Sequence, residues 1–440
     1  MLALVVGCSA SGAGDVSTDT EATTSGSGSE GETETGDRSA FTPGEIDTIL
    51  TWLGPLPPAP PPDPTNAYAD DPGAAAFGQA MFFETGFSGN GMVSCATCHV
   101  PQMGFADGQE GTSVGIERTG RSTMSVFNSG YGAASESQTN WQYWDGRCDS
   151  PWCQALTAAE NEIDMGGARS DVALLIFDQY RAQYEAVFGQ MRELRDAEGA
   201  PVVPAGSRPG DPQWDALAPE LRDDVTRIFV NFGKAVAAYE RRLVSRDSRF
   251  DQLWEELAGG AEDSDALTAQ EKEGLRVFIG NGRCLGCHGG PNFTDGQFHN
   301  IAVPQQGTDI APSDPGRAQG LATVLEQEFN CAGPWSDHPD KGTCAVSTLG
   351  AATGELGAFK TPSLRGVAST APYMHTGNFA TLDSVMIHYD FGGAAAGTFD
   401  GTRDELMRPV GLSAAERSAL VAFMEALEGE PLDPALMSAP

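Results

Sequence analysis

The sequence predicts a mainly α-helical protein whose helices are joined by long irregular loops, and three observations support this. Apolar residues recur at helical spacing in several segments. Alternating apolar and polar runs, which are typical of half-buried strands, are nearly absent. The 54 glycines and 28 prolines among 440 residues indicate that much of the remaining chain is irregular.

Three segments have the pattern of amphipathic helices. Residues 223–243, DDVTRIFVNFGKAVAAYERRL, place their apolar side chains on one helical face. Residues 267–280 and 412–429 each begin with a capping box and end at a glycine. The two capping boxes are Thr268 with Glu271 and Ser413 with Glu416. We therefore expect a helix at each of the three places, and the second one leads directly to Cys284.

The charge of the chain limits the classes of partner. With 61 acidic and 26 basic residues, the net charge is −35. This balance argues against nucleic-acid binding, because phosphate contacts need clustered Lys and Arg. It favours cationic partners instead. The apolar fraction of 40% is large enough for buried cores at this length.

The composition changes abruptly after the first cysteine. Residues 1–8, MLALVVGC, are apolar, and LVVGC resembles the lipobox of bacterial lipoproteins, in which Cys8 would be acylated. The alternative is an ordinary N-terminus with a chance cysteine. Residues 9–40 are rich in Ser, Thr, Gly and acids, which predicts a flexible linker. No apolar run is long enough to span a membrane. We therefore expect export to the periplasm or cell envelope, with membrane attachment only through a lipid on Cys8.

The nine cysteines fall into groups of one, four and four. Cys8 is the predicted lipid site, and four cysteines belong to two Cys-x-x-Cys-His motifs. The remaining four form two close pairs, which suggests two short-loop disulfides in an oxidising compartment. These pairs are Cys148 with Cys153 and Cys331 with Cys344.

The two Cys-x-x-Cys-His motifs are the most informative feature of the sequence. They consist of Cys95, Cys98 and His99, and of Cys284, Cys287 and His288. A zinc site would need four ligands from distant segments, and a thioredoxin-like dithiol needs no histidine. Haem attachment uses every residue, with two thiols for the vinyl groups and an imidazole for the iron. The motifs therefore predict two covalently bound haem c groups.

Several further stretches share their order with one protein family. FSGNGMVSCATCH, YWDGR, FGKAVAAYERRLVS, FTDGQFHNIAV and FKTPSLRGVASTAPYMHTGNFATLDSVMIHY together resemble the bacterial di-haem cytochrome c peroxidase and MauG family. The resemblance extends from about residue 41 to the end. It implies two cytochrome c-like haem domains, at 41–260 and 261–440. It also implies that the haem on His99 meets hydrogen peroxide and the haem on His288 supplies electrons.

The chemistry supports this division of labour independently, because reduction of peroxide to water takes two electrons and one ferrous haem gives one. The haem that meets peroxide also needs an accessible coordination position. None of the six histidines lies between the two motifs. The resemblance places Ile116 where many family members have a histidine that blocks the resting iron. We therefore expect a permanently accessible N-terminal haem.

Peroxide cleavage also needs a group that moves a proton and a hydrogen-bonding partner. The resemblance places these roles on Asp164 and Gln154, where the family has a glutamate and a glutamine. Aspartate is one methylene shorter, so Glu160 or Glu162 could compensate. The structural alternative is that Asp164 caps the next helix or pairs with Arg169.

The resemblance assigns two further positions near the haems. Trp144 matches a tryptophan that assists electron passage between them, and packing of a large ring is its alternative role. The family's methionine ligand of the second haem falls on Tyr389, as in MauG. Phenolate stabilises ferric and higher iron states, which favours MauG-like chemistry. Met386 and His388 are rival ligands, whereas His375 is expected to be hydrogen-bonded structure.

Family members often hold a calcium ion between their domains. The two backbone carbonyls match Thr370 and Pro372, but the asparagine position is Ser122, so calcium is a weaker prediction. Residues 304–358 form a long insertion that could shape partner docking.

The sequence thus predicts an exported di-haem oxidoreductase that uses hydrogen peroxide. Its electrons would come from a small cytochrome c or cupredoxin, or from residues of a protein substrate. The first alternative is a non-catalytic di-haem electron carrier. The second is a tethered haem protein with a structural or sensory role.

Overall fold

The computed structural model describes residues 40–133, 139–350 and 355–440, and within them the chain is mainly helical. The predicted lipid site Cys8 and all but the last residue of the predicted linker lie outside the described residues. The α-helices are α1 (Pro43–Trp52), α2 (Pro72–Phe83), α3 (Cys95–Cys98), α4 (Pro151–Glu160), α5 (Arg169–Leu175), α6 (Arg181–Phe188), α7 (Pro212–Asp215), α8 (Pro219–Glu240), α9 (Arg249–Ala258), α10 (Ala269–Ile279), α11 (Arg317–Glu326), α12 (Ala345–Thr348), α13 (Leu382–Asp390) and α14 (Ala414–Glu425). No described helix is both long and apolar enough to cross a membrane.

Shorter elements connect these helices. A π-helical stretch, η3 (Ile176–Tyr180), joins α5 to α6, and the other short turns are 3-10 helices. The latter are η1 (Pro101–Met103), η2 (Ser129–Tyr131), η4 (Cys284–Gly286), η5 (Val367–Ser369) and η6 (Pro434–Leu436). The single described sheet pairs β1 (Phe298–His299) with β2 (Phe359–Lys360) in antiparallel fashion. The three helices predicted from the sequence are confirmed as α8, α10 and α14, and both predicted capping boxes are present.

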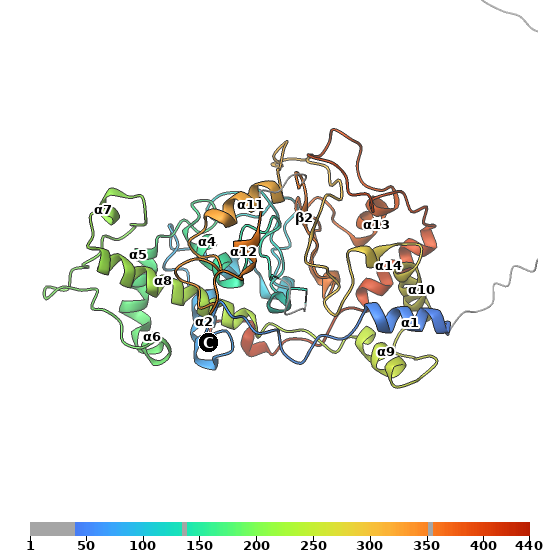
Figure 1. The fold of residues 1–440 in the computed structure, drawn as a ribbon, viewed down its shortest axis with the longest axis horizontal. Coiled ribbons are helices and arrows are strands. Elements are labelled where there is room, and N and C mark those ends of the chain that lie inside the picture. The colour runs from blue at the N-terminus through green and yellow to red at the C-terminus, as the bar shows by residue number, and fades with distance from the viewer. Residues whose placement is uncertain (1–39, 134–138, 351–354) are drawn as a thin grey trace, which may run out of the picture. The chain divides into compact units, whose positions relative to one another are not determined.

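Two large hydrophobic cores organise the described residues, and Figure 1 shows the helices that surround each of them. The first core contains side chains from α2, α4, α5 and α8, with Trp152 and Phe229 fully buried. The second core contains side chains from α10, α13 and α14, with Phe278 and Phe423 fully buried. Helices α1 and α9 precede residue 261 in the chain but pack in the second core.

The two cores share a plan. In each one, the helix that precedes a Cys-x-x-Cys-His motif crosses a later helix at a glycine. A Cβ on Gly78 of α2 would overlap the carbonyl of Ala235 in α8. A Cβ on Gly274 of α10 would overlap the carbonyl of Ala419 in α14. Both crossings therefore depend on the absence of a side chain.

We expect Gly78→Ala to lower the free energy of unfolding by about 1–3 kcal/mol, because the added methyl group must push α2 away from α8. Urea denaturation of the holoprotein would measure this loss. Gly44→Ala is the matched control, because a Cβ at that position in α1 meets open space. Equal denaturation midpoints for the two variants would contradict the close crossing.

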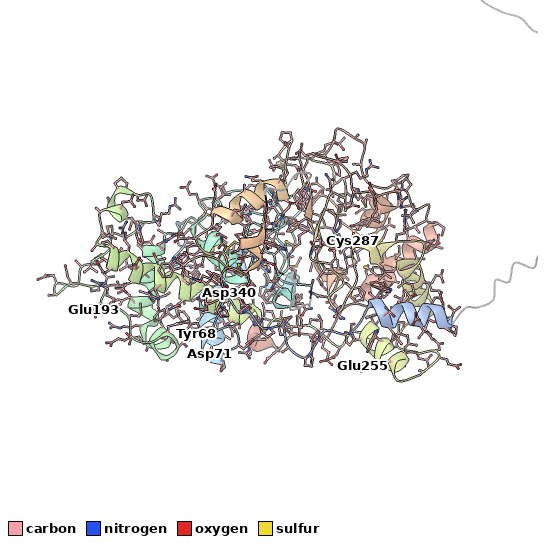
Figure 2. All side chains as sticks on the ribbon, in the orientation of Figure 1. Tyr68, Asp71, Glu193, Glu255, Cys287 and Asp340 are labelled. Atoms are coloured by element: carbon pink, nitrogen blue, oxygen red, sulfur yellow. A yellow bond between two sulfur atoms is a disulfide. The ribbon has the colours of Figure 1, made fainter. Side chains whose placement is uncertain are left out.

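Both predicted disulfides are confirmed. Cys148 and Cys153 are bonded with their Cα atoms 5.6 Å apart, and Cys331 and Cys344 with theirs 6.0 Å apart. The second disulfide belongs to a small third core that the 304–358 insertion forms with Trp141. Figure 2 shows acidic side chains such as Glu193 and Glu255 at the periphery, whereas Cys287 lies among the inner loops.

Candidate functional site

The two Cys-x-x-Cys-His motifs fold into equivalent turns. Each turn is one short helical element, α3 in the first motif and η4 in the second. In both, the backbone N–H of the histidine donates to the carbonyl of the first cysteine. This distance is 2.9 Å from His99 to Cys95 and 2.8 Å from His288 to Cys284. The turn therefore brings the imidazole next to the two thiols.

Both histidine rings are oriented by a backbone carbonyl. The Nδ1–H of His99 donates to the carbonyl of Phe105 at 3.1 Å, and that of His288 donates to Phe293 at 2.9 Å. Each phenylalanine is fully buried, and its backbone lies in the left-handed region, with φ of 56° at Phe105 and 50° at Phe293. Burial lowers the pKa of both imidazoles, which favours their neutral form. Each ring thus keeps Nε2 available as a ligand atom, as an iron-binding histidine requires.

One cavity of about 650 Å³ reaches both motifs. Its wall includes all the residues for which the sequence predicted a role at a haem or at calcium: Cys95, Cys98, His99, Ser122, Trp144, Gln154, Asp164, Cys284, Cys287, His288, Thr370, Pro372 and Tyr389. Such a large continuous cavity fits planar cofactors attached at both motifs.

The cysteines in the cavity have the properties of haem-attachment thiols. Burial raises the pKa of Cys98 to about 11 and that of Cys284 to about 12, so both are neutral thiols at pH 7. Zinc binding requires thiolates held together with other ligands. Among the described residues, no cluster of three metal-ligand atoms includes His99 or His288, whereas Cys287 lies in one with Asp295 and His299. Each motif brings two thiols and one imidazole together, which is the set that covalent haem attachment uses.

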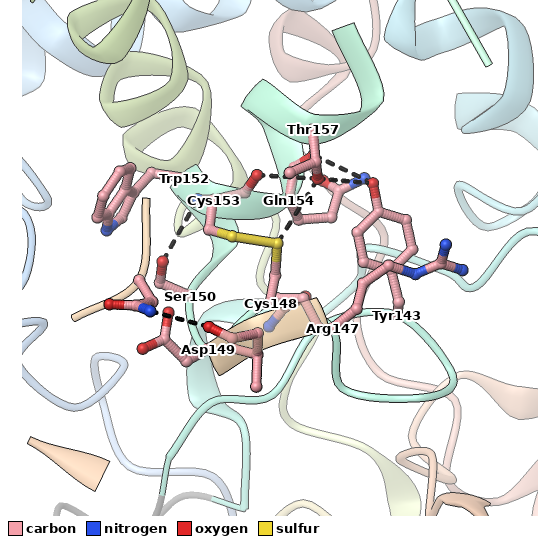
Figure 3. Close-up of a disulfide and its surroundings, with 12 residues drawn as sticks. Tyr143, Arg147, Cys148, Asp149, Ser150, Trp152, Cys153, Gln154 and Thr157 are labelled. Atoms are coloured by element: carbon pink, nitrogen blue, oxygen red, sulfur yellow. Dashed lines mark hydrogen bonds between the residues drawn. A yellow bond between two sulfur atoms is a disulfide. The ribbon is translucent and has the colours of Figure 1, made fainter. Parts of the chain in front are cut away.

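Gln154 and Asp164 line the cavity on the side of the first motif. Gln154 lies on α4, one residue after the Cys148–Cys153 disulfide, whose loop also contains the helix cap Ser150. Figure 3 shows Tyr143 beside this disulfide, with its hydroxyl donating to the Gln154 carbonyl at 3.3 Å. The disulfide and this hydrogen bond fix the first turn of α4, and with it the position of Gln154.

The Asp164 carboxylate has no hydrogen bond or ion pair within the described ranges. Burial raises the pKa of Asp164, and the nearby Arg147 guanidinium opposes this rise. Neither structural alternative from the sequence is present, because Arg169 pairs with Glu160 at 2.8 Å and the next helix is capped at Ala168. The carboxylate is therefore free to act on a molecule in the cavity.

The two glutamates that could have compensated for the short Asp164 side chain are engaged elsewhere. Glu160 holds the buried Arg169 through two hydrogen bonds to its side chain, at 2.9 and 2.8 Å. Glu162 is largely exposed and pairs with Arg208. Neither residue lines the cavity.

Trp144 and His375 both line the cavity and are in contact with each other. The indole Nε1–H of Trp144 donates to the Ser122 carbonyl at 2.9 Å, and its ring lies 6.3 Å from the His375 ring. His375 stacks on Phe359 at 3.6 Å and accepts a hydrogen bond from Gln305. Burial lowers the pKa of His375 to about 3, so the ring is neutral. These contacts agree with the structural role predicted for His375.

On the side of the second motif, Tyr389 and Met386 both line the cavity from α13. Burial and the neighbouring Cys287 and Cys284 raise the pKa of Tyr389. His388 does not line the cavity, because its Nε2–H donates to the Ile301 carbonyl at 2.8 Å. The geometry therefore favours Tyr389 or Met386 over His388 as a ligand.

Ser122, at the predicted calcium position, and Ile116, at the position of the blocking histidine, both make contacts within the protein. The Ser122 hydroxyl donates to the Met374 carbonyl at 2.7 Å, and no described cluster of metal-ligand side chains lies there. These contacts give calcium no support. Ile116 packs against the first core and is not on the cavity wall.

Sequence reasoning assigned no role to two charged residues on the cavity wall, the buried Glu240 and the half-buried Lys360. Burial raises the pKa of Glu240 on α8 to about 8 and lowers that of Lys360 on β2 to about 8. The Lys360 ammonium donates to the Trp141 carbonyl at 2.7 Å. Both residues lie inside stretches that carry the family resemblance, AYERRL and FKTPSLR. Their presence in these stretches was the only indication in the sequence that they belong to the site.

Comparisons with known proteins identify the family of the chain. A family model described as di-haem cytochrome c peroxidase matches residues 72–258. The chain is 33% identical over 398 residues to cytochrome-c peroxidase IdrP1 of Denitromonas iodatirespirans, covering 88% of this chain and 89% of that protein. It is 30% identical over 364 residues to methylamine utilization protein MauG of Methylorubrum extorquens, covering 82% and 79%. The solved di-haem peroxidase BthA of Burkholderia thailandensis has a similar fold, with a TM-score of 0.59, 21% identity and coverage of 87% and 95%. The chain therefore belongs to the di-haem cytochrome c peroxidase family.

Proposed function

We propose that the protein is an exported di-haem c-type oxidoreductase that reduces hydrogen peroxide. The observation that carries the proposal is the single cavity whose wall holds both motifs together with Asp164 and Gln154. The family implies two haem c groups, and their irons supply the oxidation-state changes that peroxide reduction requires. Cys95, Cys98 and His99 would hold one haem, and the corresponding residues of the second motif would hold the other.

The roles of the remaining side chains follow from their positions. Asp164 accepts a proton from one peroxide oxygen and returns it to the other, because its carboxylate is free and faces the cavity. Gln154 orients peroxide through its amide. Trp144 would lie on the electron path from the C-terminal to the N-terminal haem. Tyr389 would be a ligand of the C-terminal haem iron, which favours MauG-like chemistry over simple peroxide removal.

Two cytochrome c-like domains, 41–260 and 261–440, form part of this proposal. Their support is the repeated plan of a helix, a Cys-x-x-Cys-His turn and a glycine crossing. Helices α1 and α9 would pack onto the second domain.

The partners and location are proposed from charge and from the N-terminal composition. The net charge of −35 favours a cationic electron donor, such as a small cytochrome c or cupredoxin, or a cationic protein substrate. The protein would be anchored in the periplasm or cell envelope through a lipid on Cys8.

Rapid mixing of the matured protein with hydrogen peroxide tests the function. A pyridine haemochrome assay should first find two covalently bound haems per chain. Peroxide should then change the haem absorption spectrum within a single turnover. Unchanged spectra from a two-haem protein would favour the alternative, a di-haem electron carrier.

We also expect the fully oxidised protein to give a high-spin ferric EPR signal from the N-terminal haem. The reason is that Ile116 stands where many family members have the blocking histidine, and that no histidine lies between the two motifs. A low-spin bis-histidine signal assigned to this haem would contradict permanent access.

A further inference from the structure

The segment that carries Trp144 is held by residues from the C-terminal part of the chain. The backbone N–H of Lys360 donates to the Trp144 carbonyl at 2.7 Å. Its ammonium reaches the Trp141 carbonyl at the same distance. Residues 141–146 are thus fixed from outside their own domain, and a second cation, Arg317, completes the attachment.

The Arg317 guanidinium contacts two aromatic rings. It lies 4.2 Å from the centre of the Trp141 ring and 4.1 Å from that of Phe298, and the two rings meet edge to face with an interplanar angle of 64°. Its Nη1 donates to the carbonyls of Gly146 at 2.8 Å and Asp145 at 3.3 Å. Only 3% of Arg317 is exposed, so these contacts are made out of water. The two ring contacts and the two hydrogen bonds together hold the segment in place.

The position of Arg317 is itself well determined. It is the first residue of α11, and its N–H donates to the Ala358 carbonyl at 2.8 Å. One turn further along, a Cβ on Gly320 would overlap the Asp145 carbonyl. A Cβ on Gly146, which is left-handed with φ of 66°, would overlap Phe298. The backbone of α11 therefore touches that of Asp145, and the Phe298 ring touches Gly146. These close contacts restrict movement of the Trp144 segment.

We propose that Arg317 is a positioning residue that fixes Trp144 on the path between the two haems and so sets the rate of electron transfer between them. The inference rests on the proposed function in giving Trp144 that path. It also assigns a role to the start of the 304–358 insertion, which supplies Arg317. Because electron transfer slows steeply with distance, a small displacement of the indole has a large kinetic effect.

Pulse radiolysis of the two-haem protein provides the test, because it injects electrons without peroxide and follows their redistribution between haems. Arg317→Lys keeps the charge but loses the planar fork and the guanidinium contacts with the two rings. We expect it to slow redistribution severalfold, because electron transfer weakens exponentially as the indole is displaced. If that variant does not attach two haems, Phe298→Leu removes one of the two ring contacts of Arg317 and should slow redistribution in the same way.

A double-mutant cycle separates positioning from general destabilisation. Trp144→Phe alone should slow redistribution, and adding Arg317→Lys should slow it no further, because the residue acts through the indole. Hydrogen exchange of holoprotein peptides covering 141–148 should be faster in Arg317→Lys than in the parent. Arg169→Lys is the matched control, since Arg169 is buried against Phe229 and Phe329 but does not touch residues 141–146.

An unchanged redistribution rate in Arg317→Lys with faster exchange at 141–148 would overturn the proposal. So would equal slowing by Arg317→Lys in the presence and absence of Trp144, or equal slowing by Arg169→Lys. Failure of the proposed function is distinguishable, because it would appear as normal redistribution between haems with no reaction toward peroxide.

Discussion

Replacing Asp164 by asparagine should lower kcat for hydrogen peroxide reduction by about 10²–10⁴-fold, the usual contribution of a general acid–base group. Asparagine keeps the shape of the side chain but cannot carry the proton between the peroxide oxygens. Asp164 has no described ion pair, so the change breaks no structural contact. Steady-state turnover with a chemical electron donor would measure the loss, and the two-haem content should stay unchanged.

The pH profile gives a second readout for Asp164. Burial raises the pKa of this carboxyl, and only its ionised form can accept a proton. The kcat/KM of the parent should therefore fall as the pH drops through this raised pKa, and the Asp164→Asn variant should lose that limb of the profile. Glu162→Gln is the matched control, because Glu162 is an exposed acid close in sequence but outside the cavity. Full turnover by Asp164→Asn would move the acid–base role elsewhere.

Replacing Tyr389 by methionine should raise the midpoint potential of the C-terminal haem by on the order of a few hundred millivolts. A phenolate stabilises the ferric state, whereas a thioether favours the ferrous state. Tyr389 is mostly buried, lines the cavity and lies close to the thiols of the second motif, as an iron ligand must. Spectroelectrochemical titration would measure the potential of each haem separately.

Met386 provides the control for this assignment, because it lines the same cavity from the same helix. Met386→Leu should leave the potential unchanged if Tyr389 is the ligand. A near-infrared sulfur-to-iron charge-transfer band in the parent, lost in Met386→Leu, would instead identify Met386 as the ligand.

Local features of the fold were predictable because their causes are local. The capping box of Thr268 with Glu271 satisfies backbone donors within one turn, so the sequence alone indicates where α10 begins. The disulfides followed from a count, because only four cysteines remained outside the other predicted sites. The equivalent turns at the two motifs likewise depend on five consecutive residues.

The sequence could not show which of several neighbouring residues is available at the site, because this depends on contacts with distant segments. The sequence left Glu160 and Glu162 as substitutes for Asp164, and only the positions of Arg169 and Arg208 engage them elsewhere. It also left His388 as a rival of Tyr389, and the decision depends on the Ile301 carbonyl, 87 positions away. Arg317 was overlooked because its role needs Trp141, Phe298 and Gly146 together, and no spacing in the sequence connects them.

The glycine crossings at Gly78 and Gly274, together with the left-handed Phe105 and Phe293, are the same architectural solution used twice in one chain. Duplication of an ancestral single-haem gene would leave this kind of internal symmetry. After such an event, selection would retain the attachment machinery in both copies while the opposite wall of each pocket diverged. Asp164 and Gln154 now line the cavity near the first motif, and Tyr389 lines it near the second, so the two copies would differ in the side chains that face each haem.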